Sequence, residues 1–397
     1  MKAVYRTLAV FAALLFAAGV GYFALAGAVG AQAAAAQPAA EQDAVTAKVA
    51  EASALLDHYF VGETDETLLG DGAVEGLIGA TGDRWSYYIS ADDYASYRES
   101  MENAYVGIGV TIQRAEDESG YVIKTVTAGG PAEEAGVQVG DVLIAAAGQS
   151  LQDVDLDGTK ALVRGEAGTT VELTFLRDGK ELTLTVERRS IETPVVTYEM
   201  LPGGIGYITI ENFDANCARD AKAAIDALMS DGAASLLFDV RYNPGGLKSE
   251  LCELLDYLLP EGPLFYSYYY DGTSDVEYSD ASCIDLPMAV LVNADSYSAA
   301  EFFAAALQEY GAAKVVGVQT VGKGYFQNTF RLSDGSAMAI STGRYCTPNG
   351  VSLAGVGITP DEIVELSDED SVKLYYGQLA HEDDAQLAAA VALLSGD

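Results

Sequence analysis

Two segments of the sequence carry side chains that could perform nucleophilic catalysis together. Ser298 stands between an apolar strand-like run, residues 288–292, and an apolar-faced helical run, residues 299–310. At such a strand-to-helix turn, the positive end of the helix dipole would stabilise negative charge that develops beside the serine hydroxyl. Lys323 lies in a Gly-Lys-Gly stretch after another strand-like run. If burial lowers the pKa of this lysine, its neutral amine can take the proton from a serine hydroxyl.

Each of these segments also has an ordinary structural explanation. Ser298 and Glu301 have the spacing of a capping box, which satisfies backbone groups at a helix start without any catalysis. Lys323 could be an exposed turn residue. A third segment, residues 243–246, reads Asn-Pro-Gly-Gly and follows a buried strand-like run. Its glycines can turn backbone N–H groups toward a substrate oxygen, as an oxyanion hole requires, or they can simply form a turn.

Residue types that are scarce exclude other chemistry. The chain has two histidines, His58 and His381, and both lie far in sequence from these segments. A Ser–His–Asp triad or a zinc site is therefore not expected. Four cysteines are scattered without a Cys-x-x-Cys spacing, and the sequence leaves open whether they form disulfides or stay as buried free thiols. They are Cys217, Cys252, Cys283 and Cys346.

The chain is strongly acidic, with 59 Asp and Glu residues against 22 Lys and Arg residues and a formal net charge of −37. Such a surface repels phosphate backbones, so nucleic acid is not expected as a partner. Apolar residues make up 50% of the chain, and its 397 residues suffice for two or three domains with their own cores.

The start of the chain differs from the rest. Lys2 and Arg6 precede an apolar stretch, residues 8–29, and an Ala-rich run follows as far as residue 40. The stretch is long enough to cross a bilayer and longer than the usual core of a cleaved signal, although residues 31–33 would suit a signal peptidase. Residues 1–40 are therefore predicted to be a signal-anchor, or a signal peptide, with an Ala-rich linker. Either way, the remainder is expected to be extracytoplasmic, with the N-terminal segment as its contact with the membrane.

The remaining pattern divides into four segments. Residues 41–100 favour helices and, with residues 83–88 included, are interpreted as a packed helical arm rather than a site. Residues 101–190 contain short β-patterned runs separated by glycines and have the size of one small domain. Residues 191–365 alternate strand and helix patterns, which predicts a mixed α/β fold with largely parallel pairing. Residues 366–397 form a C-terminal helical segment.

Helical residues 42–80 could pair two chains into a homo-oligomer or simply pack on the α/β core. Particular strands and helices are expected from residue 203 onward. Strands are predicted at residues 205–210, 235–240, 288–292, 314–318 and 337–341, and helices at residues 217–229, 248–258, 299–310 and 384–394.

In this order, the segments resemble the carboxy-terminal processing peptidases, also called tail-specific proteases. The resemblance covers about residues 42–365. Further pieces that carry it are residues 83–88, 206–208 with Phe213, 345–350 and 357–361. Each piece is weak alone, but the ordered set is specific to this family.

The resemblance implies a role for particular residues. The nucleophile of the family falls on Ser298, its general base on Lys323 and its supporting polar residue on Gln327. Tyr297 and Ala300 depart from the family pattern, as do the bulky Tyr325 and Phe326, and these departures alter the wall of the cleft more than its chemistry. Cys346 is unusual in its segment and has no explanation in the resemblance. The implied oxyanion donors are the backbone N–H groups of Ala299 and of either Gly245 or Gly246.

Residues 105–110 resemble the carboxylate-binding loop of a PDZ domain, so residues 101–190 are expected to be such a domain. Its backbone N–H groups would hold the C-terminus of a peptide that adds as a strand to the sheet edge. Arg164 resembles a family position that couples the PDZ domain to the active site, although it could be a plain surface arginine. A β-rich domain that merely packs is the alternative for the whole segment. The implied peptide-binding residues are Gly107, Ile108, Gly109 and Val110.

The function implied by the resemblance is that of a serine endopeptidase that recognises C-terminal tails through its PDZ domain. It would act on proteins or peptides with accessible C-termini through an acyl-enzyme, without a metal or an organic cofactor. A non-catalytic cell-surface PDZ scaffold that binds exported protein tails is the alternative, but it would have no need of Ser298, Lys323 and Gln327 together. A lipase or esterase fits poorly, because the sequence has no Gly-x-Ser-x-Gly elbow.

Overall fold

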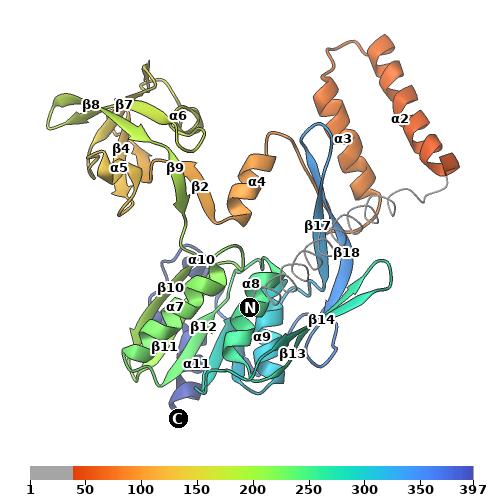
Figure 1. The fold of residues 1–397 in the computed structure, drawn as a ribbon, viewed down its shortest axis with the longest axis vertical. Coiled ribbons are helices and arrows are strands. Elements are labelled where there is room, and N and C mark those ends of the chain that lie inside the picture. Colours follow the sequence, from red (N-terminus) through yellow and green to blue (C-terminus); the bar gives the residue numbers. More distant parts are fainter. Residues whose placement is uncertain (1–38, 397) are drawn as a thin grey trace, which may run out of the picture. The chain divides into compact units, whose positions relative to one another are not determined.

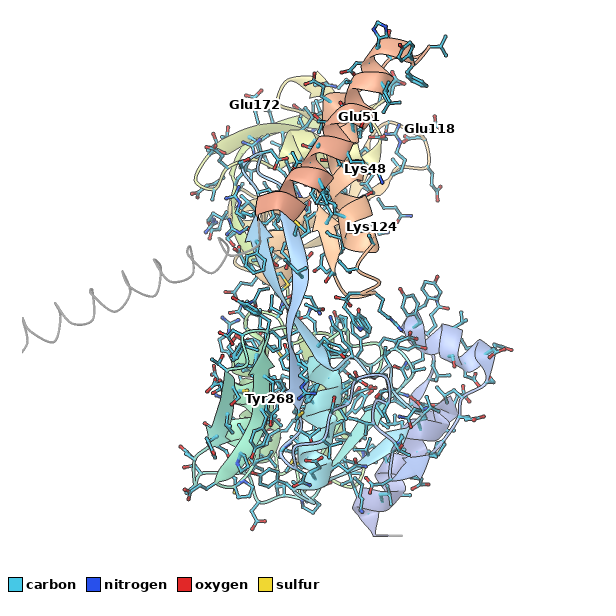
Figure 2. All side chains as sticks on the ribbon, turned by 90° about the vertical axis from the view of Figure 1, so that its right-hand side faces the viewer. Lys48, Glu51, Glu118, Lys124, Glu172 and Tyr268 are labelled. Atoms are coloured by element: carbon cyan, nitrogen blue, oxygen red, sulfur yellow. The ribbon has the colours of Figure 1, made fainter. Side chains whose placement is uncertain are left out.

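A computed structural model describes residues 39–396 (Figure 1). These residues belong to two compact units, and the boundary in the sequence lies between residues 82 and 83. The described part of the first unit contains α2 (Ala39–Tyr59), on which Figure 2 labels Lys48 and Glu51, and α3 (Glu66–Gly79). The predicted signal or anchor in residues 8–29 lies outside the described residues. Within residues 39–396, no helix is both long enough and apolar enough to span a bilayer.

The second unit is built around a six-stranded sheet in which most neighbours are parallel, as the sequence predicts for its α/β core. The one antiparallel pair is formed by the first two strands of this sheet. In spatial order the strands are β10 (Val196–Leu201), β11 (Ile205–Ile210), β12 (Ser235–Asp239), β15 (Met288–Val292), β16 (Ala313–Gly317) and β19 (Glu362–Ile363).

Helices cover both faces of this sheet because its strands are apolar on both sides. Successive side chains alternate between faces, so Phe238 joins one hydrophobic core and its neighbour Leu237 joins the other. The helices of the first core are α7 (Cys217–Ser230), α8 (Lys248–Leu258) and α9 (Ala299–Glu309), and α11 (Ala385–Ser395) packs on the opposite face (Figure 1). The mixed α/β fold predicted from the sequence is thus confirmed.

A second, antiparallel sheet corrects two predictions. Residues 337–341 were expected among the core strands, but they begin a long strand that pairs in this other sheet. Residues 83–88 were assigned to a helical arm, yet Tyr87 and Tyr88 belong to a strand because they pair with that same long strand. The strands are β1 (Tyr87–Ile89), β13 (Gly262–Tyr269), β14 (Ser274–Ser279), β17 (Tyr325–Arg331) and β18 (Ala337–Cys346), and β17 and β18 form a long hairpin (Figure 1).

The glycine-rich part of the chain forms a separate small β domain with its own core, which includes Ile123, Leu173 and Phe175. Its main sheet has the order β3-β4-β5-β7-β8, with β6 beside β5, and leaves β3 as an edge strand. The elements from α4 to β9 are α4 (Tyr94–Met101), β2 (Ala104–Gly107), β3 (Val110–Arg114), β4 (Tyr121–Val126), α5 (Pro131–Glu134), β5 (Val142–Ala146), β6 (Gln149–Ser150), α6 (Leu156–Val163), β7 (Thr170–Arg177), β8 (Lys180–Glu187) and β9 (Arg189–Glu192).

A buried ion network fixes the C-terminal segment to the central sheet. The segment contains α10 (Asp368–Tyr375), a short 3-10 turn η1 (His381–Asp383) and α11. The Arg241 side chain, only 2% exposed, pairs with Asp239 at 2.6 Å and with Asp384 at 2.8 Å. Asp384 also caps α11 by accepting from the amides of Gln386 and Leu387. The Asn-Pro-Gly-Gly turn begins two residues after Arg241, so this network supports the site as well as the fold.

The substitution Arg241→Ala is expected to lower the free energy of unfolding by about 3–5 kcal/mol, because it leaves two buried carboxylates without their partner. Urea unfolding measures this change. The control is Arg219→Ala, which breaks a pair with Glu192 in which the side chains are 55% and 60% exposed; its expected cost is below about 1 kcal/mol. Equal losses in the two variants would contradict a structural role for the buried network.

Candidate active site

Ser298 lies at the turn between β15 and α9, as the sequence predicts, with a backbone conformation that is unusual for a serine. Its φ of 58° and ψ of −124° fall in a region that side chains with a Cβ rarely adopt. The preceding residues hold the turn in place. The Ser296 hydroxyl donates to the carbonyl of Val240 at 2.7 Å, and Asn293 Oδ1 accepts from the amide of Tyr242 at 2.9 Å.

Glu301, in the first turn of α9, joins the serine turn to the lysine loop. Its carboxylate is fully buried and accepts the backbone N–H of Ser298 at 3.0 Å, so this part of the predicted capping box is present. The same carboxylate accepts the amides of Gly322 at 2.7 Å and Lys323 at 2.9 Å, and the Thr320 hydroxyl. Burial raises the pKa of the Glu301 carboxyl, and these hydrogen bonds oppose that shift.

The Asn-Pro-Gly-Gly turn packs against Ser298 so closely that only glycine fits at two positions. A Cβ on Gly245 would lie 2.6 Å from Ser298 Cβ, and a Cβ on Gly246 would lie 2.2 Å from the carbonyl carbon of Phe213. Both glycines have positive φ, at 92° and 152°. The turn therefore requires both glycines for space as well as for conformation.

The structure distinguishes the two glycines as donors. The N–H of Gly245 donates to Asn243 Oδ1 at 2.8 Å, within the turn itself. For the N–H groups of Gly246 and Ala299, the described residues supply no acceptor. Ala299 begins α9, where backbone N–H groups lack helical partners. Gly246 and Ala299 are thus the amides available to an incoming oxygen.

Lys323 extends its side chain into a partly buried, aromatic environment. Its ammonium nitrogen lies 5.0 Å from the centre of the Trp85 ring and 5.7 Å from that of Tyr297. Burial lowers the pKa of Lys323, while the carboxylates of Asp83 and Glu301 oppose this effect. The Lys323 side chain makes no hydrogen bond to any described residue.

Gln327 lies near these residues but does not orient the lysine amine in this structure. Its side-chain amide donates to Ser341 Oγ at 3.0 Å and to the carbonyl of Tyr325 at 3.3 Å. No hydrogen bond joins Gln327 to Lys323 within the part of the chain that the structure describes. The supporting role assigned to Gln327 from the family resemblance stays a prediction.

One cleft of about 560 Å³ brings the predicted residues together: Ser298, Lys323, Gln327, Gly245 and Gly246 all line it. Beside Ser298, a separate small hollow has room for about one water molecule. Its wall includes Phe265, Phe302 and Tyr345. The hollow could therefore hold a group no larger than about a methyl beside the serine.

Many of the residues that line the cleft were not predicted from the sequence as parts of a site, among them Trp85, Asp214 and Arg84. Trp85 belongs to the segment that was interpreted as a packed arm, yet it lines the cleft beside Lys323. Asp214 also lines it, and one of its carboxylate oxygens is buried without a hydrogen-bond partner among the described residues. Burial raises the pKa of Asp214 to about 7, and the nearby Glu250 carboxylate adds to the shift. Arg84 completes the set, with its guanidinium 4.3 Å from the centre of the Trp85 ring.

The small β domain has a groove of about 320 Å³ between its edge strand β3 and helix α6. All four predicted peptide-binding residues line it, together with apolar side chains such as Leu143 and Val163. The described residues supply no acceptor for the N–H groups of Ile108 and Gly109. The four predicted residues are Gly107, Ile108, Gly109 and Val110.

Arg164, at the end of α6, connects this groove with helix α4. Its guanidinium donates to Glu99 of α4 at 2.9 Å and lies 5.3 Å from the centre of the Tyr105 ring. Tyr97 and Met101, from the same helix, line the cleft that contains Ser298. Arg164 is thus paired with a helix that also lines the cleft, and its role in coupling the PDZ domain to the active site stays a prediction.

No group of three or more His, Cys, Asp and Glu side chains within residues 39–396 could hold a metal ion. The four cysteines are free thiols in the structure, but the interpretation as buried free thiols describes only two of them. Cys217 and Cys346 are buried, and Cys283 is exposed.

Comparison with known proteins agrees with this architecture of a peptidase domain and a PDZ domain. Residues 204–364 match peptidase family S41, and residues 106–187 match the PDZ domain. A carboxyl-terminal-processing protease of Synechocystis sp. is 31% identical over 331 residues, which cover 82% of this chain and 76% of that protein. The chain therefore belongs to the family of the carboxyl-terminal-processing proteases.

Two further proteins illustrate the similarity. A probable CtpA-like serine protease of Staphylococcus haemolyticus is 33% identical over 310 residues, and the matched region covers 77% of this chain but only 62% of that relative. Among solved structures, the photosystem II D1 C-terminal processing protease is 28% identical, with a TM-score of 0.48. That match covers 84% of this chain and 91% of the other.

The substitution Glu301→Gln is expected to lower the free energy of unfolding by about 1–3 kcal/mol, because a side-chain amide cannot accept all of the donors that surround the carboxylate. Hydrogen exchange should also become faster at the amides of Gly322 and Lys323. The matched control is Glu369→Gln on α10, where the carboxylate is 78% exposed. If the amides of the lysine loop keep their protection in Glu301→Gln, the carboxylate does not hold this loop.

Proposed function

We propose that the protein is a serine endopeptidase in which Ser298 is the nucleophile and Lys323 is the general base. The observation that carries the proposal is the buried Glu301 carboxylate, which accepts backbone N–H groups from both residues and so holds the two together in one cleft. Membership in the family of carboxyl-terminal-processing proteases supports it independently. No histidine lines the described part of the cleft, and its other lysine, Lys248, is paired with Glu277 at 2.7 Å.

In the proposed reaction, the neutral amine of Lys323 takes the hydroxyl proton as Ser298 Oγ attacks the carbonyl carbon of a peptide bond. The carbonyl oxygen becomes an oxyanion, which accepts hydrogen bonds from the N–H groups of Ala299 and Gly246. The C–N bond then breaks, and the proton on Lys323 passes to the leaving amine. Water attacks the acyl-enzyme with Lys323 again as base, and this step restores Ser298 and releases a carboxylic acid.

Gly246, rather than Gly245, is assigned the role of the second oxyanion donor. The N–H of Gly245 is already engaged by Asn243, and a donor that must first break a bond within its own turn would stabilise an oxyanion less. The hollow beside Ser298 further suggests that the substrate residue before the scissile bond has a small apolar side chain.

The PDZ domain is proposed to capture the C-terminal tail of a substrate protein in the groove between β3 and α6. The edge of β3 can pair with an added strand, and the N–H groups of Ile108 and Gly109 can hold a terminal carboxylate. The apolar lining of the groove favours an apolar last residue. Arg164 and Glu99 would then connect an occupied groove to α4, which contributes to the cleft wall.

The site of action is proposed from the sequence alone. Lys2, Arg6 and the apolar residues 8–29 favour a location outside the cytoplasmic membrane.

Ser298→Ala and Lys323→Ala are each expected to reduce cleavage of an unstructured protein by at least about a thousandfold, because each removes one partner of the proton transfer. Tail-labelled substrate and mass spectrometry identify the fragments. The matched control Lys314→Ala removes an exposed lysine that pairs with Asp361 on the surface and should leave cleavage unchanged. Undiminished cleavage by Ser298→Ala would end the proposal, and tail binding with no cleavage by the wild type would favour a scaffold instead.

Peptides that end in an apolar residue are expected to bind the inactive Ser298→Ala protein at least about tenfold more tightly with a free carboxylate than with a C-terminal amide. The reason is that an amide cannot replace the charge-assisted hydrogen bonds to Ile108 and Gly109. Fluorescence anisotropy measures both affinities. Lys124→Ala, on the exposed face of β4 (Figure 2), is the control for non-specific charge effects. Equal affinity for the two peptides would exclude carboxylate capture by this loop.

A further inference from the structure

The ammonium group of Lys323 lies over the faces of two neighbouring aromatic rings in the structure. Its nitrogen is 5.0 Å from the Trp85 ring centre and 5.7 Å from the Tyr297 ring centre. The two rings are 6.0 Å apart and inclined by only 30°. A cation within about 6 Å of an aromatic face is attracted to it, whereas a neutral amine is not. This pair of rings therefore distinguishes between the two protonation states of Lys323.

Trp85 is held in position by its own short segment. Its backbone N–H donates to Asp83 Oδ1 at 3.0 Å, and the Ser86 hydroxyl donates to Asp83 Oδ2 at 2.6 Å. Ser86 Oγ in turn accepts the amide of Ser341 on β18 at 3.0 Å. The ring is thus anchored to the antiparallel sheet rather than carried on a loose loop.

Tyr297 is held by a different segment of the chain, the turn that leads to Ser298. It immediately precedes Ser298, and its backbone N–H donates to the carbonyl of Asn243 at 3.1 Å. The two rings come from segments that are more than two hundred residues apart, and each is tied to its own part of the fold. The two rings therefore come together beside Lys323 only in the folded protein.

The surroundings of Lys323 affect its protonation state in opposite directions. Burial favours its neutral form, whereas the Asp83 and Glu301 carboxylates and the two ring faces favour the ammonium. Arg84 lies over the same Trp85 ring and competes for it. Other titratable groups that line the cleft are Tyr87, Tyr97, Asp214, Lys248, Tyr269 and Tyr345.

We propose that Trp85 and Tyr297 form an aromatic cage that retains Lys323 as an ammonium ion in the substrate-free protein, and that the lysine acts as a base only after it leaves the cage and loses its proton to solvent. The proposal rests on the assignment of Lys323 as the general base. It makes Trp85 a positioning residue, because the ring acts on the reaction only through the lysine.

The kinetic test compares Trp85→Leu, which removes the aromatic face, with Trp85→Phe, which keeps one. The pH profile of kcat/KM reports ionisations of the free enzyme, and activity should fall as the pH drops through the pKa of Lys323. In Trp85→Leu this limb should move to lower pH by about half a unit to one unit. At pH values below the midpoints of both the wild type and the variant, kcat/KM of the variant should therefore be about three- to tenfold higher. Trp85→Phe should move less.

The matched control is Tyr268→Leu, which removes a similar cation contact outside the cleft. Tyr268, labelled in Figure 2, has the Arg344 guanidinium 5.2 Å from its ring centre and does not line the cleft. Its pH profile should match the wild type. A Trp85→Leu limb that stays in place or moves to higher pH would overturn the cage.

A second measurement needs no cleavage, so it separates the cage from the proposed peptidase activity. Trp85 is the only tryptophan of the chain, and its emission reports directly on the ring beside Lys323. The emission of the substrate-free protein should titrate with pH, lose this transition in Lys323→Met and keep it in Asp214→Asn. A transition that persists in Lys323→Met, or that disappears only in Asp214→Asn, would show that the ring does not sense the lysine.

Discussion

The site depends on one buried carboxylate. Glu301 belongs to the first turn of α9, and from there it accepts the amide of the serine turn and two amides of the lysine loop. One segment follows β15 and the other follows the neighbouring strand β16, and a long hydrogen bond from the amide of Val321 to the carbonyl of Ser296, at 3.4 Å, also joins them. Without a common acceptor, the N–H groups of both would be buried and unsatisfied. Glu301 therefore caps α9 and also sets the distance between the serine turn and the lysine loop.

Close to that carboxylate, the Asn-Pro-Gly-Gly turn is packed so tightly that a side chain on either glycine would clash with the protein. Gly245 allows the turn to approach Ser298, and Gly246 allows it to approach the backbone of Phe213. The Arg241 network fixes the start of the same turn against the C-terminal segment. The Asn-Pro-Gly-Gly turn is thereby held at both ends. Backbone groups that are fixed in advance stabilise developing charge better than groups that must reorganise.

Much of this could be predicted from the sequence, because apolar periodicity and turn residues are local signals. The strands that begin near Ile205, Ser235 and Met288 and the helix after Ser298 lie where their patterns indicate. The antiparallel sheet was missed for two reasons. The pairing of Tyr87 with Ala339 joins residues that are far apart in the chain and leaves no local pattern. The hairpin of β17 and β18 does carry a local Asp-Gly turn, at residues 334–335, but this signal was not used.

The same reason limits what could be predicted of the site. The position of Trp85 depends on that distant pairing, so its segment was assigned to a packed arm. The choice between Gly245 and Gly246 depends on one hydrogen bond to Asn243, which a motif cannot reveal. Glu301 was predicted as a cap, but its contacts with the lysine loop require the tertiary fold.

The backbone of Ser298 has a consequence for the stability of the fold. A serine at φ 58° and ψ −124° costs the folded state about 1–3 kcal/mol, whereas a glycine would occupy that region with little penalty. The hydroxyl and thermodynamic stability are thus opposed at a single position. Glycine at this position would relieve the backbone strain, so the fold itself gains no stability from a serine side chain here.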